Sequence, residues 1–320
     1  MNILFHIIQY VFYSIVCKES DLREGLHMQK YLVSIIMPTY NRRQIIKDAI
    51  DSCLEQTYEN IELIICDDHS TDGTYEYICE RMKEDSRIKY CVTPEGKKGA
   101  NAARNTAIQI AKGKYIIFLD SDDYLLKDSI EIRVDTFKKN PNVALVYGHV
   151  YVEQGKRVDK WIYPDLQKEK KNQRVFLMEN LALCCQISIM FRKSIINKIG
   201  LLDEQQKGWT DDGFVVAVGM RYRVMNCGKF VATARKSEIS MTSNKWNMYN
   251  GCKMMVHRYS KDILKYASLK RYFIWQIRLF SLFCYAKEDE SQKTKIKKFW
   301  KFLHEESKRR IVSYFRIYCE

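Results

Sequence analysis

The first half of the chain repeats one pattern four times. An uninterrupted apolar run is followed by polar residues and then by a segment whose apolar positions fall on one helical face; the runs are 31–37, 61–66, 88–92 and 115–119. Runs of this kind predict strands buried on both faces. Because strand and helix alternate at intervals of about 25 to 30 residues, the pattern predicts an α/β fold with a doubly wound, mostly parallel sheet.

The pattern changes beyond a fifth strand predicted at 143–150. Residues 151–171 are polar and basic and predict a loop or hairpin, whereas 187–191 predict a strand and 194–199 a short helix that ends at Gly200. An apolar helix is predicted from Thr210 to Tyr222. From residue 250 onward the chain predicts helices rich in aromatic and basic residues, so a helical extension follows the sheet.

Composition is that of a folded protein with one large domain and appendages. The 320 residues are 46% hydrophobic and include only 4 Pro and 13 Gly. The 11 Cys form no CxxC pair and no cluster with His at zinc spacing, so we expect reduced thiols in a cytosolic protein.

Positive charge is concentrated at the C-terminal end. The formal charge is +14, and the last 68 residues hold 17 Lys and Arg against 7 Asp and Glu. Such a tail predicts an anionic neighbour, either a membrane surface or nucleic acid. Within it, residues 295–316 alternate aromatic and basic positions in the pattern of an interfacial amphipathic helix.

The amino-terminal segment 2–17 is apolar but too short and too polar for a transmembrane span. It lacks a basic start and a small-residue cleavage site, which excludes a secretory signal peptide. Two interpretations stay open: an interfacial anchor, or an extension ahead of a translation start at Met28.

Acidic residues follow two of the predicted strands directly. Asp67 and Asp68 come after the second strand, and Asp120, Asp122 and Asp123 after the fourth. Clustered carboxylates repel one another unless a cation lies between them, and Mg²⁺ or Mn²⁺ prefers carboxylates together with phosphate oxygens. The alternative is a polar loop that caps a helix starting near Lys127. The sequence contains neither GxGxxG nor GxxxxGK[ST], so it supports neither a dinucleotide fold nor a P-loop.

Four of these segments occur in an order and spacing that resembles the family 2 glycosyltransferases with the GT-A fold. They are VSIIMPTYN at 33–41, DDHSTDGT at 67–74, ARN at 103–105 and FLDSDD at 118–123. The resemblance covers 31–148 closely and continues more loosely to about residue 243. It implies a GT-A fold in which 31–245 form the catalytic domain, 31–148 bind the nucleotide-sugar and 149–245 the acceptor. The rest would be an N-terminal extension (1–30) and a basic helical C-terminal region (246–320).

The resemblance also implies roles for individual residues. Contacts to the nucleotide of the donor are expected from Pro38, Thr39, Tyr40, Asn41, Asp67, Asp68 and Arg104. Asp122 resembles the direct ligand of Mn²⁺ or Mg²⁺, and Asp120 resembles the acid nearer the ribose or sugar that shares the metal site. Simpler roles stay open, namely a helix N-cap for Asp68 and a surface helix position for Arg104.

The later pair Asp211 and Asp212 opens the helix predicted from Thr210. On sequence alone this is a helix start that the dipole favours. The resemblance implies that one of the two carboxylates takes the proton from the attacking hydroxyl, Asp212 first and Asp211 second. Trp209 would stack under the acceptor sugar or pack in the core. Ser237 stands where the family often has His, and Arg235 or Lys236 would then meet the diphosphate.

These expectations combine into an inverting, metal-dependent glycosyltransferase. It would move a sugar from a nucleotide-diphosphate donor, a UDP-sugar first, to a glycan or lipid-linked acceptor, working in the cytoplasm as a peripheral protein on an anionic inner membrane. The alternatives are a nucleotide-binding module whose tail binds nucleic acid, and a sugar nucleotidyltransferase. The sequence has no nucleic-acid motif, so we expect no nucleic-acid partner.

Overall fold

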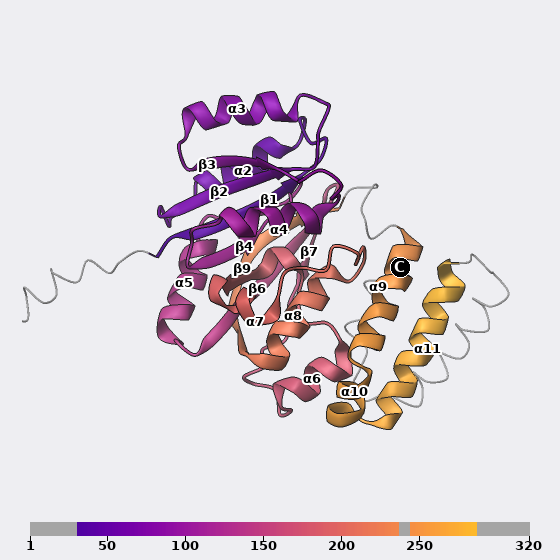
Figure 1. Ribbon diagram of the computed structural model, residues 1–320. Helices are drawn as coiled ribbons and strands as arrows, with labels where there is room; N and C mark the ends of the chain where they lie inside the picture. Colours follow the sequence, from indigo (N-terminus) through magenta and orange to yellow (C-terminus); the bar gives the residue numbers. More distant parts are fainter. Residues whose placement is uncertain (1–30, 237–243, 287–320) are drawn as a thin grey trace, which may run out of the picture.

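The computed structural model describes residues 31–236 and 244–286 (Figure 1). The four strands predicted in the first half are confirmed and form parallel pairs in the order β3-β2-β1-β4. Their bounds are β1 (Val33–Thr39), β2 (Ile61–Asp67), β3 (Ile88–Val92) and β4 (Tyr115–Phe118). Every residue of β1, β2 and β4 is buried, which is the environment that their uninterrupted apolar runs predict.

Helices connect these strands and cover the sheet (Figure 1): α2 (Ile46–Leu54), α3 (Thr74–Glu84) and α4 (Ala100–Ile110). α2 begins only at Ile46, several residues after the end of β1. The backbone N–H of Arg42 donates to Thr74 Oγ1 and that of Arg43 donates to Asp72 Oδ2, both 3.0 Å away. Because the loop after β2 binds these two groups, the chain there forms a turn and the helix starts only at Ile46.

Pro38 lies beyond the predicted apolar run 31–37 and is nevertheless part of β1. β4 pairs with β1 only as far as Ile36, and the carbonyl of Ile36 faces β4, where it accepts from Leu119 N–H. Residues two apart face the same neighbour in a strand. The side of Pro38 that lacks an N–H therefore points past the end of β4, so its missing donor costs the sheet no hydrogen bond.

The second half of the sheet is mixed. It continues in the order β4-β8-β6-β9-β5, with β7 paired to the outer part of β6. β8 is antiparallel to both β4 and β6, whereas β9 is parallel to β6 and antiparallel to β5. The bounds are β5 (Tyr124–Leu125), β6 (Val143–Gln154), β7 (Arg157–Trp161), β8 (Ile189–Arg192) and β9 (Arg223–Arg235). All pairs among the first four strands are therefore parallel, whereas in the second half only β6 and β9 form a parallel pair.

Short helices and a C-terminal helical layer complete the fold. α5 (Ser129–Lys139), α6 (Gln173–Asn180), η1 (Gln186–Ser188), η2 (Lys193–Ile195), α7 (Ile196–Ile199) and α8 (Thr210–Arg221) lie between the strands. α9 (Lys245–Arg258), α10 (Ser260–Asp262), η4 (Ile263–Ala267) and α11 (Leu269–Ala286) follow β9. In Figure 1, α9 and α11 lie side by side, with α11 farther from the sheet.

The helical extension is thus confirmed for residues 244–286. The predictions for the amino-terminal segment 2–17, the tail helix at 295–316 and Ser237 lie outside the described residues. Within the described ranges, no helix has both the length and the apolar character that a membrane span requires. The nine cysteines of this part of the chain are all free thiols.

A buried carboxylate ties β1, β2 and β3 to the start of β4. Glu62 in β2 is 2% exposed. Its Oε1 accepts from the hydroxyl of Ser34 at 2.5 Å and from the N–H groups of Lys112 at 2.6 Å and Gly113 at 3.1 Å, and Lys89 Nζ binds its Oε2. Burial alone would raise the pKa of Glu62, but the hydrogen bonds from Lys89, Ser34 and Lys112 outweigh it and lower the pKa.

Replacing Glu62 by Ala is expected to lower the free energy of unfolding by about 3 kcal/mol at pH 7, because it leaves a buried N–H and a lysine unpaired. A carboxyl group whose pKa is lowered by folding stabilises the fold above its unfolded pKa of about 4.3, and this contribution disappears as the pH falls below that value. Urea unfolding of the wild type and of the Glu62 variant should therefore show a difference in the free energy of unfolding at pH 7. This difference should narrow as the pH falls from about 4.3 to the lowered pKa of the folded state.

The exposed Glu55 provides the control. Glu55→Ala removes the same charge and should change the free energy of unfolding by less than about 0.5 kcal/mol. Equal effects of the two substitutions would contradict the structural role given to Glu62.

Candidate active site

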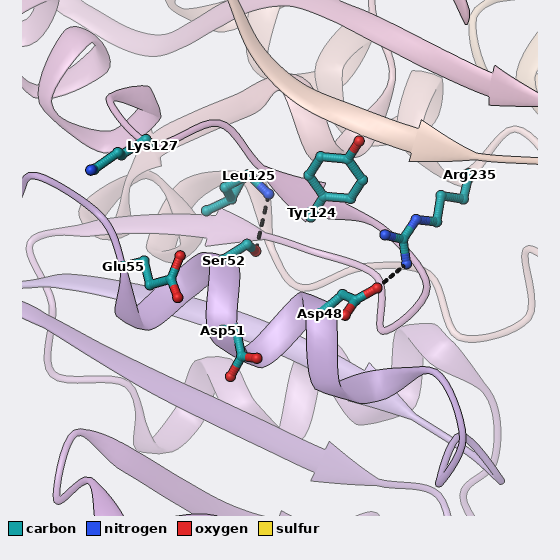
Figure 2. Close-up of a pocket in the computed structure, with 8 residues that line it drawn as sticks. All are labelled: Asp48, Asp51, Ser52, Glu55, Tyr124, Leu125, Lys127 and Arg235. Carbon is teal, nitrogen blue, oxygen red and sulfur yellow. Dashed lines mark hydrogen bonds and ion pairs between the residues drawn. The ribbon is translucent and has the colours of Figure 1, made fainter. Parts of the chain in front are cut away.

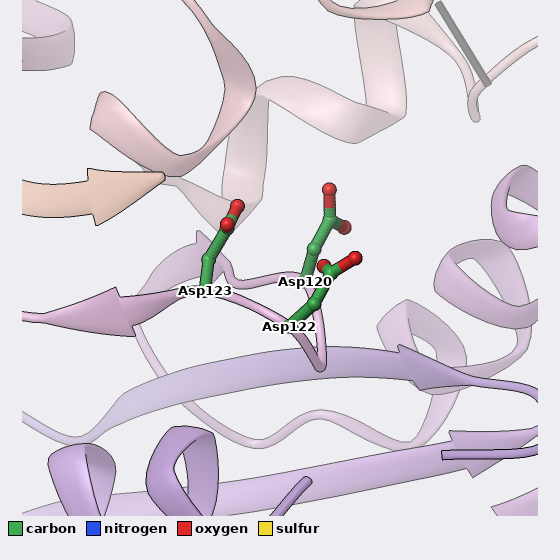
Figure 3. Close-up of side chains that lie close together, drawn as sticks. All are labelled: Asp120, Asp122 and Asp123. Atoms are coloured by element: carbon green, nitrogen blue, oxygen red, sulfur yellow. The ribbon is translucent and has the colours of Figure 1, made fainter. Parts of the chain in front are cut away.

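The polar residues predicted at the carboxyl ends of the strands meet at one edge of the sheet. The turn after β4 carries Asp120, Asp122 and Asp123, whose carboxylates point to the same side of the loop (Figure 3). Oxygen atoms of all three lie within 4.8 Å of one another. The turn is closed by the N–H of Asp123, which donates to the carbonyl of Asp120 at 3.1 Å.

Burial and repulsion between carboxylates raise the pKa values of Asp122 and Asp123. Burial, and then the charge of Asp120, raise the pKa of Asp122, while the guanidinium of Arg42 acts in the opposite direction. The same causes, with Asp122 added, raise the pKa of Asp123 well above its ordinary value. Asp123 is 8% exposed, and its Oδ1 accepts from the backbone N–H of Arg235 at 2.8 Å. Positive charge placed among these oxygens would therefore be stabilised.

Two arginines supply part of this positive charge. Arg104 in α4 is 2% exposed and forms an ion pair with Asp120 through Nη2, while its Nη1 donates to Asn101 Oδ1 at 3.1 Å. Arg42 Nη2 lies 3.6 Å from Asp122 Oδ2. The open alternative for Arg104, a surface helix position, is wrong because its side chain is buried against the acid cluster.

The donor set fits a hard divalent cation. Mg²⁺ and Mn²⁺ bind carboxylate oxygens, and the cluster offers three carboxylates of which Asp120 and Asp122 are half-exposed. Asp123 was noted within the cluster but was not assigned as a ligand from the sequence. Its burial and its bond to Arg235 N–H show that it also orients the turn.

The two predicted nucleotide loops follow β1, which pairs with β4, and β2, which pairs with β1. Thr39 ends β1 and Asp67 ends β2, and these two residues are register partners. Asn41 Oδ1 accepts from Thr71 N–H, and Ser70 Oγ binds Asn41 N–H, each at 2.8 Å, so the loops after β1 and β2 hold each other. The side chain of Tyr40 is 57% exposed beside them. The structure thus brings the predicted segments 38–41 and 67–68 together at one edge of the sheet.

Asp67 and Asp68 have different surroundings. Asp67 is buried and fully engaged, since Oδ1 accepts from Ser70 and Oδ2 accepts from the hydroxyl of Tyr90 at 3.0 Å. Asp68 Oδ2 accepts from Gly99 N–H at 2.8 Å, at the start of α4, and its Oδ1 is buried with no hydrogen-bond partner. The alternative of an N-cap for α3 is wrong for Asp68, because Gly73 occupies that position. An unpaired buried acceptor is costly, so Asp68 Oδ1 is suited to a ligand donor.

The later acidic pair opens α8, as predicted, with Trp209 rather than Thr210 at the N-cap. Asp211 Oδ2 accepts from Gln186 N–H and Oδ1 accepts from Thr210 Oγ1, each at 3.0 Å. Burial raises the pKa of Asp211, Arg104 counteracts this, and Asp120 adds to it. Asp211 therefore lies within the electrostatic reach of the β4 cluster although the two are far apart in sequence.

Asp212 has a different environment. Burial and the charge of Asp211 raise the pKa of Asp212 well above its ordinary value, with only a backbone hydrogen bond from Leu183 acting against them. No arginine is among the causes. Asp212 is thus the member of the pair that binds a proton more readily.

A polar brace, not found from the sequence, joins α4 to the segment before α8. Asn105 Nδ2 donates to the carbonyl of Leu202 at 2.9 Å, and Asn105 Oδ1 accepts from Leu202 N–H at 2.9 Å. Asn101 Nδ2 donates to the carbonyl of Asp203 at 2.8 Å, and Gln206 Nε2 donates to that of Trp209 at 2.7 Å. Only the ARN segment at 103–105 hinted at this brace, since Asn105 is its last residue.

The C-terminal helices support the same segment from the other side. A Cβ added at Gly251 of α9 would lie 2.1 Å from the carbonyl oxygen of Gly208. Trp209 is half-buried, and its ring meets Trp275 of α11 edge-on, with centroids 6.2 Å apart. Both interpretations of Trp209 therefore stay open, because it packs on one side and is accessible on another.

A separate pocket of about 280 Å³ lies between α2 and β5. Figure 2 shows Asp48, Asp51 and Glu55 on one side of it and Arg235 on the other. The guanidinium of Arg235 forms an ion pair with Asp48 at 2.8 Å. A contact of Arg235 or Lys236 with the diphosphate stays a prediction.

The parallel β1–β4 strands, the acid cluster at their carboxyl edge and the second acidic pair form the arrangement that a GT-A fold implies. A model of the family "Glycosyl transferase family 2" matches residues 34–200. The chain belongs to glycosyltransferase family 2 and is a glycosyltransferase.

Two curated relatives extend this result. The chain is 35% identical over 223 residues to WfgD of Escherichia coli, a UDP-Glc:α-D-GlcNAc-diphosphoundecaprenol β-1,3-glucosyltransferase, covering 68% of this chain and 83% of that protein. It is 33% identical over 228 residues to TuaG of Bacillus subtilis (strain 168), a putative teichuronic acid biosynthesis glycosyltransferase, covering 68% and 84%.

Among solved structures, the fold is similar to residues 1–349 of S. aureus TarS in complex with UDP-GlcNAc. The TM-score is 0.60 with 20% sequence identity, covering 79% of this chain and 72% of that one. The likeness confirms the GT-A-type fold.

Asp122→Asn is expected to weaken Mn²⁺ binding on the order of 10- to 100-fold, because one carboxylate charge leaves the cluster. Calorimetric titration of Mn²⁺ in the presence of UDP measures the change. The exposed Asp128 lies six positions along the chain, and Asp128→Asn gives the same charge change as a control. Unchanged Mn²⁺ affinity in the Asp122 variant would show that the cluster is a structural turn.

Gly251→Ala is expected to destabilise the fold by about 2 kcal/mol, since overpacking against Gly208 costs more than the helix gains from alanine. Asn250 is exposed on the same helix, so Asn250→Ala is the matched control and should be neutral or slightly stabilising. Urea unfolding of the three proteins compares them, and a Gly251 variant as stable as the control would exclude the tight contact.

Proposed function

We propose that the chain transfers a sugar from a UDP-sugar to a hydroxyl of a lipid-linked or surface-polysaccharide acceptor, by a metal-dependent inverting displacement. The observation that carries this proposal is the shared electrostatic environment of the two acidic groups. Asp211 is influenced by Arg104 and Asp120, and Asp123 is influenced by Asp211. Such proximity suits a donor held at one group and an acceptor at the other.

The relatives support the choice of donor and acceptor. WfgD is named for UDP-Glc and a diphosphoundecaprenol-linked sugar, and TuaG for the biosynthesis of a cell-surface polymer. Single displacement on an α-linked donor gives a β linkage, which is the linkage in the name of WfgD. We therefore propose UDP-glucose as the first donor to test and a lipid-diphosphate-linked glycan as the acceptor.

The nucleotide would lie over the loops 38–41 and 67–68, with Asp68 Oδ1 free to accept from it. Asp120 and Asp122, with Asp123 beside them, would hold Mn²⁺ or Mg²⁺, which neutralises charge on a departing diphosphate. Arg104 forms an ion pair with Asp120 and orients it. In this proposal 31–148 bind the donor, 149–245 form the acceptor side, and 246–320 are the helical region.

Asp212 is our proposed general base. The acceptor oxygen attacks the anomeric carbon while the bond to the diphosphate oxygen breaks, and the base takes the hydroxyl proton. A base works best when its pKa lies near the working pH. The pKa of Asp212 is raised well above its ordinary value, whereas Asp211 is held by Gln186 and Thr210 and stabilised by Arg104. We propose that Asp211 positions the start of α8.

Lipid-linked acceptors would bring the enzyme to the membrane. We propose that it acts at the cytoplasmic face of the cell membrane as a peripheral protein.

The first test is a screen of UDP-, GDP-, dTDP- and CMP-sugars with Mn²⁺ or with EDTA, reading melting temperature and product release. A donor that binds only the folded state raises the melting temperature. We expect stabilisation by a UDP-sugar only with metal, and release of UDP. Formation of UTP and sugar 1-phosphate from the UDP-sugar and added pyrophosphate would instead indicate a nucleotidyltransferase, and no binding in any condition would contradict the proposal.

Asp212→Asn is expected to lower the turnover number about 10³-fold with UDP-sugar affinity unchanged, because only proton removal is lost. In the wild type, protonation of the base as the pH falls should remove activity well above the ordinary aspartate pKa of about 3.9. Initial rates against pH, with donor affinity measured by calorimetry, test both statements. Asp211→Asn is the companion variant; a larger loss of turnover there than in the Asp212 variant would exchange the two roles.

A further inference from the structure

α11 presents apolar side chains on two opposite sides. Its inner side packs on the protein, where Trp275 is fully buried and meets Trp209. Its outer face, defined here as Leu269, Phe273 and Phe280, is exposed by 60%, 58% and 54% of each side chain. These positions are spaced by four and seven residues, so they form one stripe along the helix. The contacts that the inner side of α11 makes with the protein do not explain why these three apolar side chains are exposed.

The surroundings of the outer face are strongly basic. From residue 245 to 286 the chain holds 8 Lys and Arg and a single acid, Asp262. Arg258 and Arg271 bind Asp203 and Glu179 of the catalytic part. Four lysines remain exposed on these helices: Lys253, Lys261, Lys265 and Lys270. The neighbour that this surface fits therefore carries negative charge as well as apolar groups.

We propose that the outer face of α11 docks onto an anionic lipid bilayer. A helix with large apolar side chains on one stripe and lysines beside it is suited to lie in a membrane interface, with the apolar groups among the acyl chains and the ammonium groups at the phosphates. Leu264 in η4, before α11, is a further exposed apolar side chain, at 46%. This inference rests on the proposed function, which brings the enzyme to a membrane. It identifies the surface of the protein that contacts the lipid.

Docking through this face would bring the acceptor side close to lipid. Trp275 on the inner side of α11 contacts Trp209, which is the N-cap residue of α8 and directly precedes Thr210 and Asp211. α11 therefore contacts the residue that begins α8, two positions before Asp211.

The test uses the full chain with vesicles of phosphatidylcholine alone or mixed with phosphatidylglycerol, and measures co-flotation. We expect binding only to the anionic vesicles, and weaker binding as salt rises. The double variant Phe273→Ser with Phe280→Ser should lose on the order of tenfold or more in vesicle affinity. Lys265→Glu with Lys270→Glu should give a similar loss. Ile162, 66% exposed after β7, provides the control Ile162→Ser, which should bind as wild type.

Two further readouts separate the possible failures. Transfer to a water-soluble acceptor should be equal in wild type and the α11 variants, which shows that the variants fold. Wild-type flotation of the phenylalanine variant, or none by the wild type, overturns the docking proposal while leaving sugar transfer intact. A dimer in solution that the same substitutions dissociate would also overturn it, because a second copy would then cover the face. Vesicle binding without transfer of any sugar would contradict the proposed function alone.

Discussion

The repulsion among three carboxylates at the carboxyl end of β4 is the constraint on which the rest of the site depends. Asp120, Asp122 and Asp123 have oxygens within 4.8 Å of one another, and such a group is unstable without positive charge nearby. The fold places Arg104 against Asp120 and Arg42 near Asp122, and it gives Asp123 a backbone N–H. These contacts fix the shape of the turn. They leave part of the negative charge uncompensated, so a cation would still be stabilised there, and a bound cation is useful to an enzyme that binds a diphosphate.

α4 links the two halves of this site. Its arginine reaches the acid cluster, while Asn101 and Asn105 hold the segment that leads to α8. Because these side chains lie on one helix, the acid cluster and the segment before the second acidic pair share a rigid support. The helical extension adds to it through the close approach of Gly251 to Gly208, so the C-terminal helices are part of the scaffold of the site.

The two members of the later acidic pair show how neighbouring residues of one type acquire different chemistry. Asp211 accepts two hydrogen bonds and is stabilised by Arg104, whereas Asp212 lacks such a charge and has the more strongly raised pKa. Desolvation acts on both, so the difference comes from partners and not from burial alone. A helix N-terminus thus supplies one anchored carboxylate and one that is ready to accept a proton.

The sequence alone determined the buried strands of the first half, the acids that follow them and the family resemblance, because these depend on local apolar patterns and short motifs. It did not determine the place of Pro38 inside β1, the short strand β5, the buried role of Asp123, or the brace through Asn105 and Gln206. The buried role of Asp123 and the brace through Asn105 depend on contacts between residues about a hundred positions apart, namely Arg235 with Asp123 and Leu202 with Asn105. No local pattern encodes such contacts, and only the packing of the whole chain decides them.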